Sequence, residues 1–312
     1  MDCKMVAAMS LWASTGVRTA AAGRLRRTVT AAAAAGCAVA LVAGCVEHGA
    51  AADSGPAAAE ARPGGAKDAG DPAAAVRAAA DALVRAGSSL VETSMRMASG
   101  GTWVTVTGSG SFDYARRQGE LTLVLPRDAA GAEEHKPVTE LLTSGALYMK
   151  DRGAGVPAGK WVRVDIASLP DGNLVTGGAT DPLAAAELLR AAGQVVLVGA
   201  ETLHGTAVRH LRGVADIARA ARVAGPGAQG ALAAAARGFA VTRVPFDAWL
   251  DAEGRLRRVT EHFTYGAKDG GAAMGGGVGV VSTTDFDGFG AHVSFVMPQG
   301  DDIWTGKIVS AS

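Results

Sequence analysis

Polar and apolar residues alternate along most of the chain after residue 90, and short turn sequences separate the alternating runs. Val91 and Met95 fall on one side of the first run, and Glu92 falls on the other. A period of two is that of a strand with one buried face. His204-Gly205 lies between two such runs, as expected of a hairpin turn. The pattern predicts an α+β fold built on a large curved antiparallel β-sheet.

We expect about eleven strands and two or three helices. Asp71-Pro72 indicates an N-cap followed by proline at the first helical position, and that helix ends at Gly87. A second helix begins at Asp181-Pro182, and residues 215–239 are Ala-rich and partly helical. So few helices do not suit a doubly wound parallel sheet. The strands are expected among residues 91–97, 102–114, 121–125, 138–143, 146–150, 161–165, 194–203, 206–214, 241–251, 255–265, 280–286 and 291–297.

A basic segment and an apolar run precede Cys45. A basic region, a short apolar region and small residues at a cleavage site make a secretory signal. The apolar run, residues 28–43, is shorter than the ~20 residues of a membrane-spanning helix. With cysteine directly after Val-Ala-Gly, residues 1–44 resemble a lipoprotein signal peptide. An ordinary signal peptide with a chance cysteine is the alternative.

The lipoprotein resemblance implies that the chain is exported and that Cys45 carries the membrane anchor. Cleavage would follow residue 44, and a diacylglyceryl thioether with palmitate-type chains would form on Cys45. The expected location is the outer face of the cytoplasmic membrane.

The charge and cysteine content of the mature chain exclude two further possibilities. Loss of residues 1–44 removes five of the 30 basic and one of the 30 acidic side chains, leaving a net charge of about −4. Nucleic-acid binding needs a basic surface, so that class of partner is not expected. Cys45 is the one cysteine that remains. With its sulfur in a thioether no disulfide forms, and the fold depends on burial of apolar surface.

Composition divides the chain into four parts. Residues 1–44 are the signal peptide, and residues 45–72 are the lipidated cysteine and a tether rich in Ala, Gly and Pro. Such a tether has too few large apolar residues to fold, and as a coil it spans on the order of 25–30 Å. Residues 73–305 form the folded domain, and residues 306–312 form a C-terminal tail.

A succession of local patterns resembles the actinobacterial LppX/LprG-type lipoproteins, relatives of the LolA lipoprotein carrier. The resemblance covers roughly residues 73–300 and depends on the order of the patterns. It implies a half-barrel of about eleven strands with two or three helices on its concave side and an apolar cavity between them. The patterns are Phe112-Asp113-Tyr114, Ala146–Lys150, Lys160–Asp165, Asp181-Pro182-Leu183, Val198–Gly205, Val244–Asp251, Gly254–Val259, Asp285-Phe286 and Phe289–Val293.

The resemblance also implies a function without catalysis. In that family the cavity accepts acyl chains of lipids or lipoproteins, so a membrane-anchored carrier that presents such ligands at the cell envelope is the first hypothesis. The alternative is an envelope sensing or protein-interaction lipoprotein with little or no bound lipid. A membrane exporter or sensor is a possible partner in either case.

Nine residues are expected to line the cavity. A one-residue error in strand phase would invert every assignment, and the same residues would also suit an ordinary core. The expected residues are Leu121, Leu123, Leu147, Met149, Val162, Val164, Leu188, Trp249 and Phe263.

Motifs for catalysis, metals and cofactors are missing from the sequence. No phosphate-binding loop, His-Glu-x-x-His or Cys-x-x-Cys occurs, and His204 and His210 match no common metal spacing. Asp247 and Asp251 are expected on one strand face, where a solvated surface is the simpler interpretation than acid–base chemistry. We therefore expect no enzyme activity, no metal and no cofactor.

Overall fold

The computed structural model describes residues 70–306, except for 100–101, 126–135, 153–154 and 266–277. Cys45, the expected signal peptide and most of the expected tether lie outside the described residues. None of the described helices is long and apolar enough to cross a membrane.

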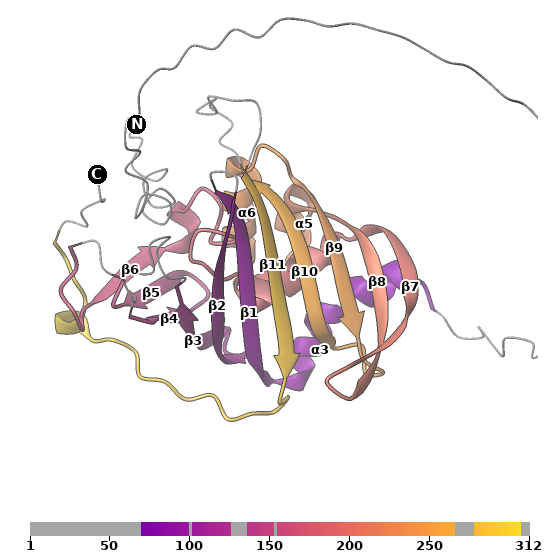
Figure 1. Ribbon diagram of the computed structural model, residues 1–312, viewed down its shortest axis with the longest axis horizontal. Coiled ribbons are helices and arrows are strands. Elements are labelled where there is room, and N and C mark those ends of the chain that lie inside the picture. The colour runs from indigo at the N-terminus through magenta and orange to yellow at the C-terminus, as the bar shows by residue number, and fades with distance from the viewer. Residues whose placement is uncertain (1–69, 100–101, 126–135, 153–154, 266–277, 307–312) are drawn as a thin grey trace, which may run out of the picture. The chain divides into compact units, whose positions relative to one another are not determined.

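The described chain forms one open sheet of eleven strands, and every pair of neighbouring strands is antiparallel. The sheet curves, with its helices behind it in the view of Figure 1. The predicted fold class is confirmed. The strands are β1 (Ser88–Ser99), β2 (Thr102–Asp113), β3 (Gln118–Val124), β4 (Val138–Leu142), β5 (Ala146–Lys150), β6 (Trp161–Asp165), β7 (Gly193–Leu203), β8 (Thr206–Asp216), β9 (Arg243–Leu250), β10 (Leu256–Tyr265) and β11 (Val278–Asp287).

The strand order makes β1 and β11 the central pair and β6 and β7 the two edges. The chain therefore crosses the whole sheet between β6 and β7. Residues 166–192 make this crossing, and the core residues within it pack on the concave face. We call residues 166–192 the crossing segment.

Five short α-helices occur in the described part of the chain, where two or three were expected. The first expected helix is interrupted at Ala78, and the Gly-Pro-Gly sequence at 225–227 separates the last two helices. Carboxylates of Asp71, Asp181 and Asp216 cap three of the five. The helices are α2 (Pro72–Arg77), α3 (Ala79–Ala86), α4 (Pro182–Leu188), α5 (Ile217–Val223) and α6 (Gln229–Gly238).

The strand expected at residues 291–297 is wrong. After β11 the chain runs without regular structure along one end of the sheet and reaches the β6 edge (Figure 1). There Ile303 forms a parallel bridge with Trp161, and the Trp304 N–H donates to the Trp161 carbonyl at 2.7 Å. Alternation alone predicted a strand, but β11 already has a neighbour on each side, β1 and β10.

Two glycines of α6 test how closely this helix packs on the crossing segment. A Cβ at Gly238 would clash with the Pro170 carbonyl, whereas a Cβ at Gly230 meets nothing within 4 Å. We expect Gly238→Ala to lower the free energy of unfolding by about 1–3 kcal/mol through overpacking. Gly230→Ala, the matched control, should cause no loss because alanine favours helix. Urea denaturation measures both, and equal stability of the two variants would contradict the packing described.

Candidate ligand-binding site

The concave face of the sheet is apolar and carries large side chains from nearly every strand. Alternation places these residues on one side, and the hydrophobic core is continuous across them. The buried core residues on this face include Val91, Met95, Val106, Phe112, Leu121, Leu123, Leu142, Leu147, Phe246, Val259, Phe263, Val280 and Phe286.

Eight of the nine residues predicted to line a cavity lie on the inner side of the molecule. Seven are on inner strand faces, and Leu188 is on α4. Met149 pairs with Val162 and Leu147 with Val164, so these four share a face. The seven strand residues are Leu121, Leu123, Leu147, Met149, Val162, Val164 and Phe263.

Trp249 was placed on the wrong face by the sequence analysis. Phe246, Ala248 and Leu250 point into the core, so Trp249 points outward. Its ring stacks on His210 at 4.3 Å between centroids, and its Nε1 donates to Glu201 at 2.9 Å. The large aromatic side chain suggested burial, but the strand phase decides the face.

The helices that cover the concave face meet it largely with alanine. Every residue of α4 is buried, and Ala184, Ala185 and Ala186 form its centre. Helix α4 lies against β10, α3 and α6. Alanine buries little apolar surface per residue, so such a cover gains less from each contact than one made of leucine would.

Among the described residues, the helices and the sheet pack against each other in one continuous hydrophobic core. A cavity of about 20 Å³ lies there, lined in part by Phe112, Leu183 and Ala231. Pockets that hold small molecules typically measure about 300–1,000 Å³. An acyl chain therefore needs the cover to move before it can enter.

A row of polar side chains crosses the middle of the apolar concave face. Thr93 on β1 pairs with Thr284 on β11, and Ser282 on β11 pairs with Glu261 on β10. All four are buried. The Ser282 hydroxyl lies 2.8 Å from the hydroxyl of Thr180 in the crossing segment. We call Thr93, Thr284, Ser282 and Glu261 the polar row.

Two members of the polar row are buried without a hydrogen-bond partner. The Thr93 hydroxyl and Oε1 of Glu261 both lack one. Burial raises the pKa of Glu261 well above its ordinary value, because burial penalises the charged form of the carboxyl group. Unpaired buried polar groups are rare in folded proteins and need an explanation.

Glu140 on β4 is a second buried glutamate on the concave face. Its register partners are Leu121 and Met149, and neither carboxyl oxygen has a hydrogen-bond partner. Burial raises the pKa of Glu140 well above its ordinary value, and the charge of Arg152 opposes this only in part.

Asp181 is also buried, but its carboxylate has hydrogen-bond partners. It accepts from the backbone N–H groups of Leu183 and Ala184 at 2.7 and 3.1 Å and so caps α4. Burial raises its pKa to about 6, although these two hydrogen bonds act in the opposite direction. The cap fixes where α4 begins above the sheet.

The sequence analysis missed Glu140 and Glu261, although a signal was present. Each glutamate occupies the apolar phase of its strand: Glu140 falls between Val138 and Leu142, and Glu261 falls between Val259 and Phe263. An acid in that phase indicates a buried charge or a buried neutral carboxyl group.

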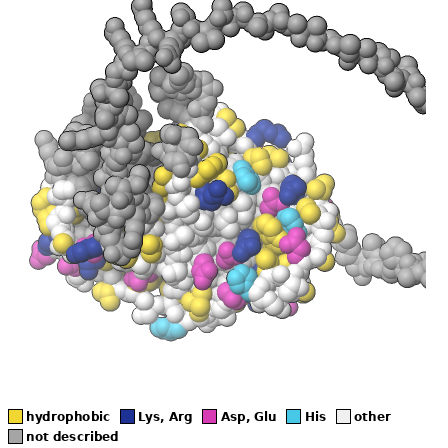
Figure 2. All heavy atoms as spheres, viewed as in Figure 1, with side chains coloured by type: hydrophobic (Ala, Val, Ile, Leu, Met, Phe, Trp, Pro, Cys, Tyr) yellow, Lys and Arg dark blue, Asp and Glu magenta, His cyan; other side chains and the backbone are white. Residues whose placement is uncertain are grey.

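The outer face of the sheet carries many charged side chains, and several of them are paired with one another. Figure 2 views this face, with acidic, basic and histidine side chains gathered over part of it. His210 Nδ1 lies 2.7 Å from Glu201 and its Nε2 lies 2.6 Å from Asp247. Arg212 donates to the same Asp247 oxygen at 2.9 Å. Among the described residues no group of three acids, histidines or cysteines is arranged to hold a metal.

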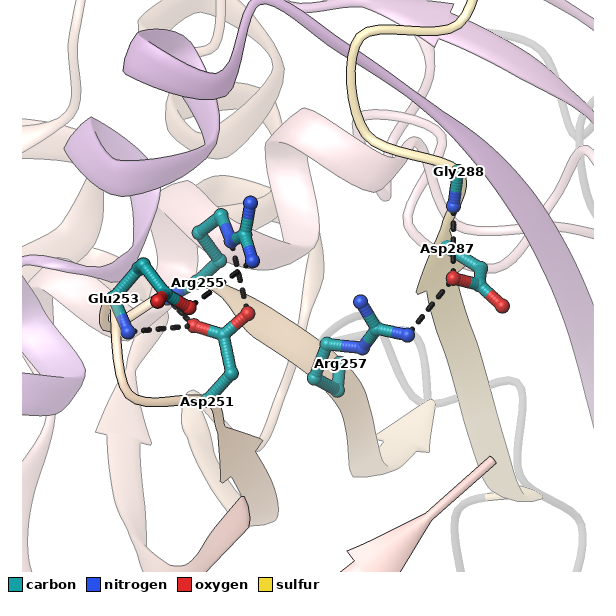
Figure 3. A network of polar contacts seen from close by, with 6 residues as sticks. All are labelled: Asp251, Glu253, Arg255, Arg257, Asp287 and Gly288. Carbon is teal, nitrogen blue, oxygen red and sulfur yellow. Dashed lines mark hydrogen bonds and ion pairs between the residues drawn. The ribbon is translucent and has the colours of Figure 1, made fainter. Parts of the chain in front are cut away.

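The charges at the turn between β9 and β10 form a second network (Figure 3). Asp251 accepts from Arg255 at 2.8 Å and stabilises the turn, and Asp287 accepts from Arg257 at 2.8 Å. Asp251 is therefore engaged by Arg255 and forms no carboxylate pair with Asp247, although the sequence placed both residues on one strand face. A pocket of about 150 Å³ beside Arg257 and Asp287 is lined also by His204.

An open groove of about 340 Å³ crosses β1, β2 and β3 on the outer face. Hydroxyl side chains line most of it, with Glu92 and Asp285 among its other residues. A polar, open lining does not desolvate an acyl chain, so the concave face remains the candidate site for an apolar ligand.

The neutral state of Glu140 predicts an unusual pH dependence of stability. The pKa of Glu140 is higher in the folded chain than in the unfolded chain. Above pH about 4.3 the unfolded chain releases this proton while the folded chain still holds it, so the free energy of unfolding falls as pH rises. We expect Glu140→Gln to stabilise the domain relative to wild type, by an amount that grows by up to roughly 3 kcal/mol from pH 5 to pH 7.

Urea denaturation across this pH range measures the effect. The control is Glu92→Gln, which changes an exposed glutamate on the outer face. Its stability should follow that of wild type at each pH. A constant difference between Glu140→Gln and wild type would show that Glu140 is ionised in the folded state.

No protein-family model matches the sequence, and no curated protein matches it. Solved structures similar to the chain include the lipoprotein LppX of Mycobacterium tuberculosis, at 12% identity over 71% of this chain and 97% of that one, with a TM-score of 0.41. LprF of Mycobacterium bovis shares 13% identity over 73% and 97%, with a TM-score of 0.38. A LolA superfamily protein of Nitrosomonas europaea shares 12% identity over 70% of this chain and 93% of that one, with a TM-score of 0.30. These neighbours are of the types that the sequence resembles.

Proposed function

We propose that the chain is an exported, lipid-anchored protein that binds acyl lipids or lipoproteins between the concave sheet face and its helical cover. It carries or presents these ligands at the outer face of the cytoplasmic membrane, and it performs no covalent chemistry. One observation carries the proposal: a wide apolar sheet face is covered by helices that meet it mainly with alanine.

The free energy of acyl-chain burial favours an opening of this kind. Each buried CH₂ group contributes about 0.8 kcal/mol, so a sixteen-carbon chain contributes roughly 12 kcal/mol. Moving α4 away from the sheet loses the contacts of three small residues, Ala184, Ala185 and Ala186, together with those of Leu183 and Leu188. An acyl chain in the same place covers the sheet with a larger apolar surface.

The expected anchor suits a ligand of this kind. A lipid on Cys45 and the tether of residues 46–72 would keep the domain within tens of ångströms of the membrane surface. Two or three acyl chains on one cysteine hold a protein on a bilayer almost permanently. A domain held there meets membrane lipids without crossing bulk water.

A second function, protein interaction without bound lipid, is favoured by two observations. The concave side is closed, with a cavity of about 20 Å³ beside α4. The β7 edge of the sheet exposes Val196, Leu197 and Val198 in succession. An exposed strand edge of this kind can pair with a partner strand.

Lipid bound to the purified protein separates the two functions. We would produce the mature chain, residues 45–312 with Cys45→Ala, in a lipid-containing host and measure its native mass. A stoichiometric acyl lipid, recovered by organic extraction, is the expected result. An apo mass that persists after challenge with dipalmitoylglycerol would reject lipid carriage and favour the protein-interaction function.

Lipidation of Cys45 is tested separately, in cells of the organism that produces the protein. We expect Cys45→Ala to abolish incorporation of an alkyne-labelled palmitate and to remove the mature protein from the membrane fraction. Cys37→Ala is the matched control, because Cys37 lies in the apolar run that is removed. It should keep both the label and the membrane location. Label retained by Cys45→Ala would place the acyl group elsewhere.

A further inference from the structure

Two members of the polar row, Thr93 and Glu261, make no hydrogen bond through their buried oxygens in the closed structure. Thr284 and Ser282 form the centre of the row, and Ser282 is hydrogen-bonded to Thr180 of the crossing segment. Thr93 and Glu261 flank them, and each has a buried oxygen without a partner. Apolar residues at these two positions would fill the core without that cost.

The position of Glu261 lies within the site proposed for acyl chains. It falls between Val259 and Phe263 on β10, and both are core residues of the concave face. Helices α3 and α4 lie against β10 and cover this strand. A ligand that replaces the cover therefore comes to lie over Glu261.

The chemistry of the unpaired groups limits what part of a ligand they contact. Burial favours the neutral form of Glu261, in which the carboxyl group offers an O–H donor, and the Thr93 hydroxyl offers another. Two unpaired O–H donors in an apolar site call for acceptors that bring no donors of their own. An ester carbonyl has this property, and it is attached to an acyl chain.

We propose, on the basis of the proposed lipid-binding function, that Glu261 and Thr93 form a hydrogen-bonding subsite for the ester carbonyl groups of acyl-ester lipids on the concave face. Saturated hydrocarbon fills the same apolar space but leaves both hydroxyl groups unpaired, and an ether-linked chain offers them only an oxygen within the chain in place of a projecting carbonyl oxygen. The subsite thus selects ester-linked chains over ether-linked chains of equal length.

A pair of probes that differ only in the two linkages tests this selection. The probes are 1,2-dipalmitoylglycerol and its dihexadecyl ether analogue, and the protein is the mature chain, residues 45–312 with Cys45→Ala. This chain retains every described residue of the sheet and its cover. We expect wild type to bind the ester about 25-fold more tightly, or about fivefold for each of two net hydrogen bonds.

Two substitutions of Glu261 complete the test. Glu261→Leu removes one of the two donors and should lower the ester preference to about fivefold, because the Thr93 hydroxyl remains. Glu261→Gln keeps an N–H donor and should retain the ester preference. Thermal unfolding checks that both variants fold, and Glu261→Leu should be no less stable than wild type without ligand, because it removes an unpaired polar group.

The outcomes separate this proposal from the function on which it rests. Equal affinity of wild type for the two probes, or an ester preference that is undiminished in Glu261→Leu, would overturn the subsite and leave lipid binding intact. Failure of wild type to bind either probe would overturn lipid binding and the subsite with it.

Discussion

The structure depends on one connection, the crossing segment between β6 and β7. These strands are the two edges of the sheet, so the chain between them has to pass over the whole of one face. Residues 166–192 pass over the concave face, and α4 within them is buried along its entire length. Asp181 caps α4, and Thr180 beside it bonds Ser282 of β11. The cover is thus part of the same continuous chain as the sheet and is attached to both of its edges.

This arrangement closes the concave face at some cost. The cover buries small residues such as Ala184, Ala185 and Ala186 of α4, and it leaves Glu140 and Glu261 buried without partners. A protein that only needed a stable core would gain by replacing such acids with apolar residues. The small alanine side chains of the cover and the unpaired carboxyl groups of the sheet both lower the free energy needed to separate the cover from the sheet. Both features are expected of a site that opens.

The sequence predicted the strands better than their faces or their order. Period-two alternation located all eleven strands, because most of them have one buried face. It did not reveal that β1 pairs with β11, since the partners of a strand are far away in sequence. Trp249 was assigned to the wrong face because residue size suggested burial, whereas Phe246 and Ala248 set the phase. Residues 291–297 alternate in the same way, but no sheet edge was left for them beside β11.

The two faces of the sheet differ in how their polar groups are satisfied. On the outer face His210 contacts two carboxylates, and Arg258 donates to Asp285 at 2.6 Å. These groups already have partners and gain little from a ligand. On the inner face Thr93 and Glu261 have none, although they are far more costly to leave unpaired there. A ligand therefore gains most binding free energy where it contacts the inner face. The same sheet keeps a charged outer surface in water, and its unpaired polar groups lie beneath the cover.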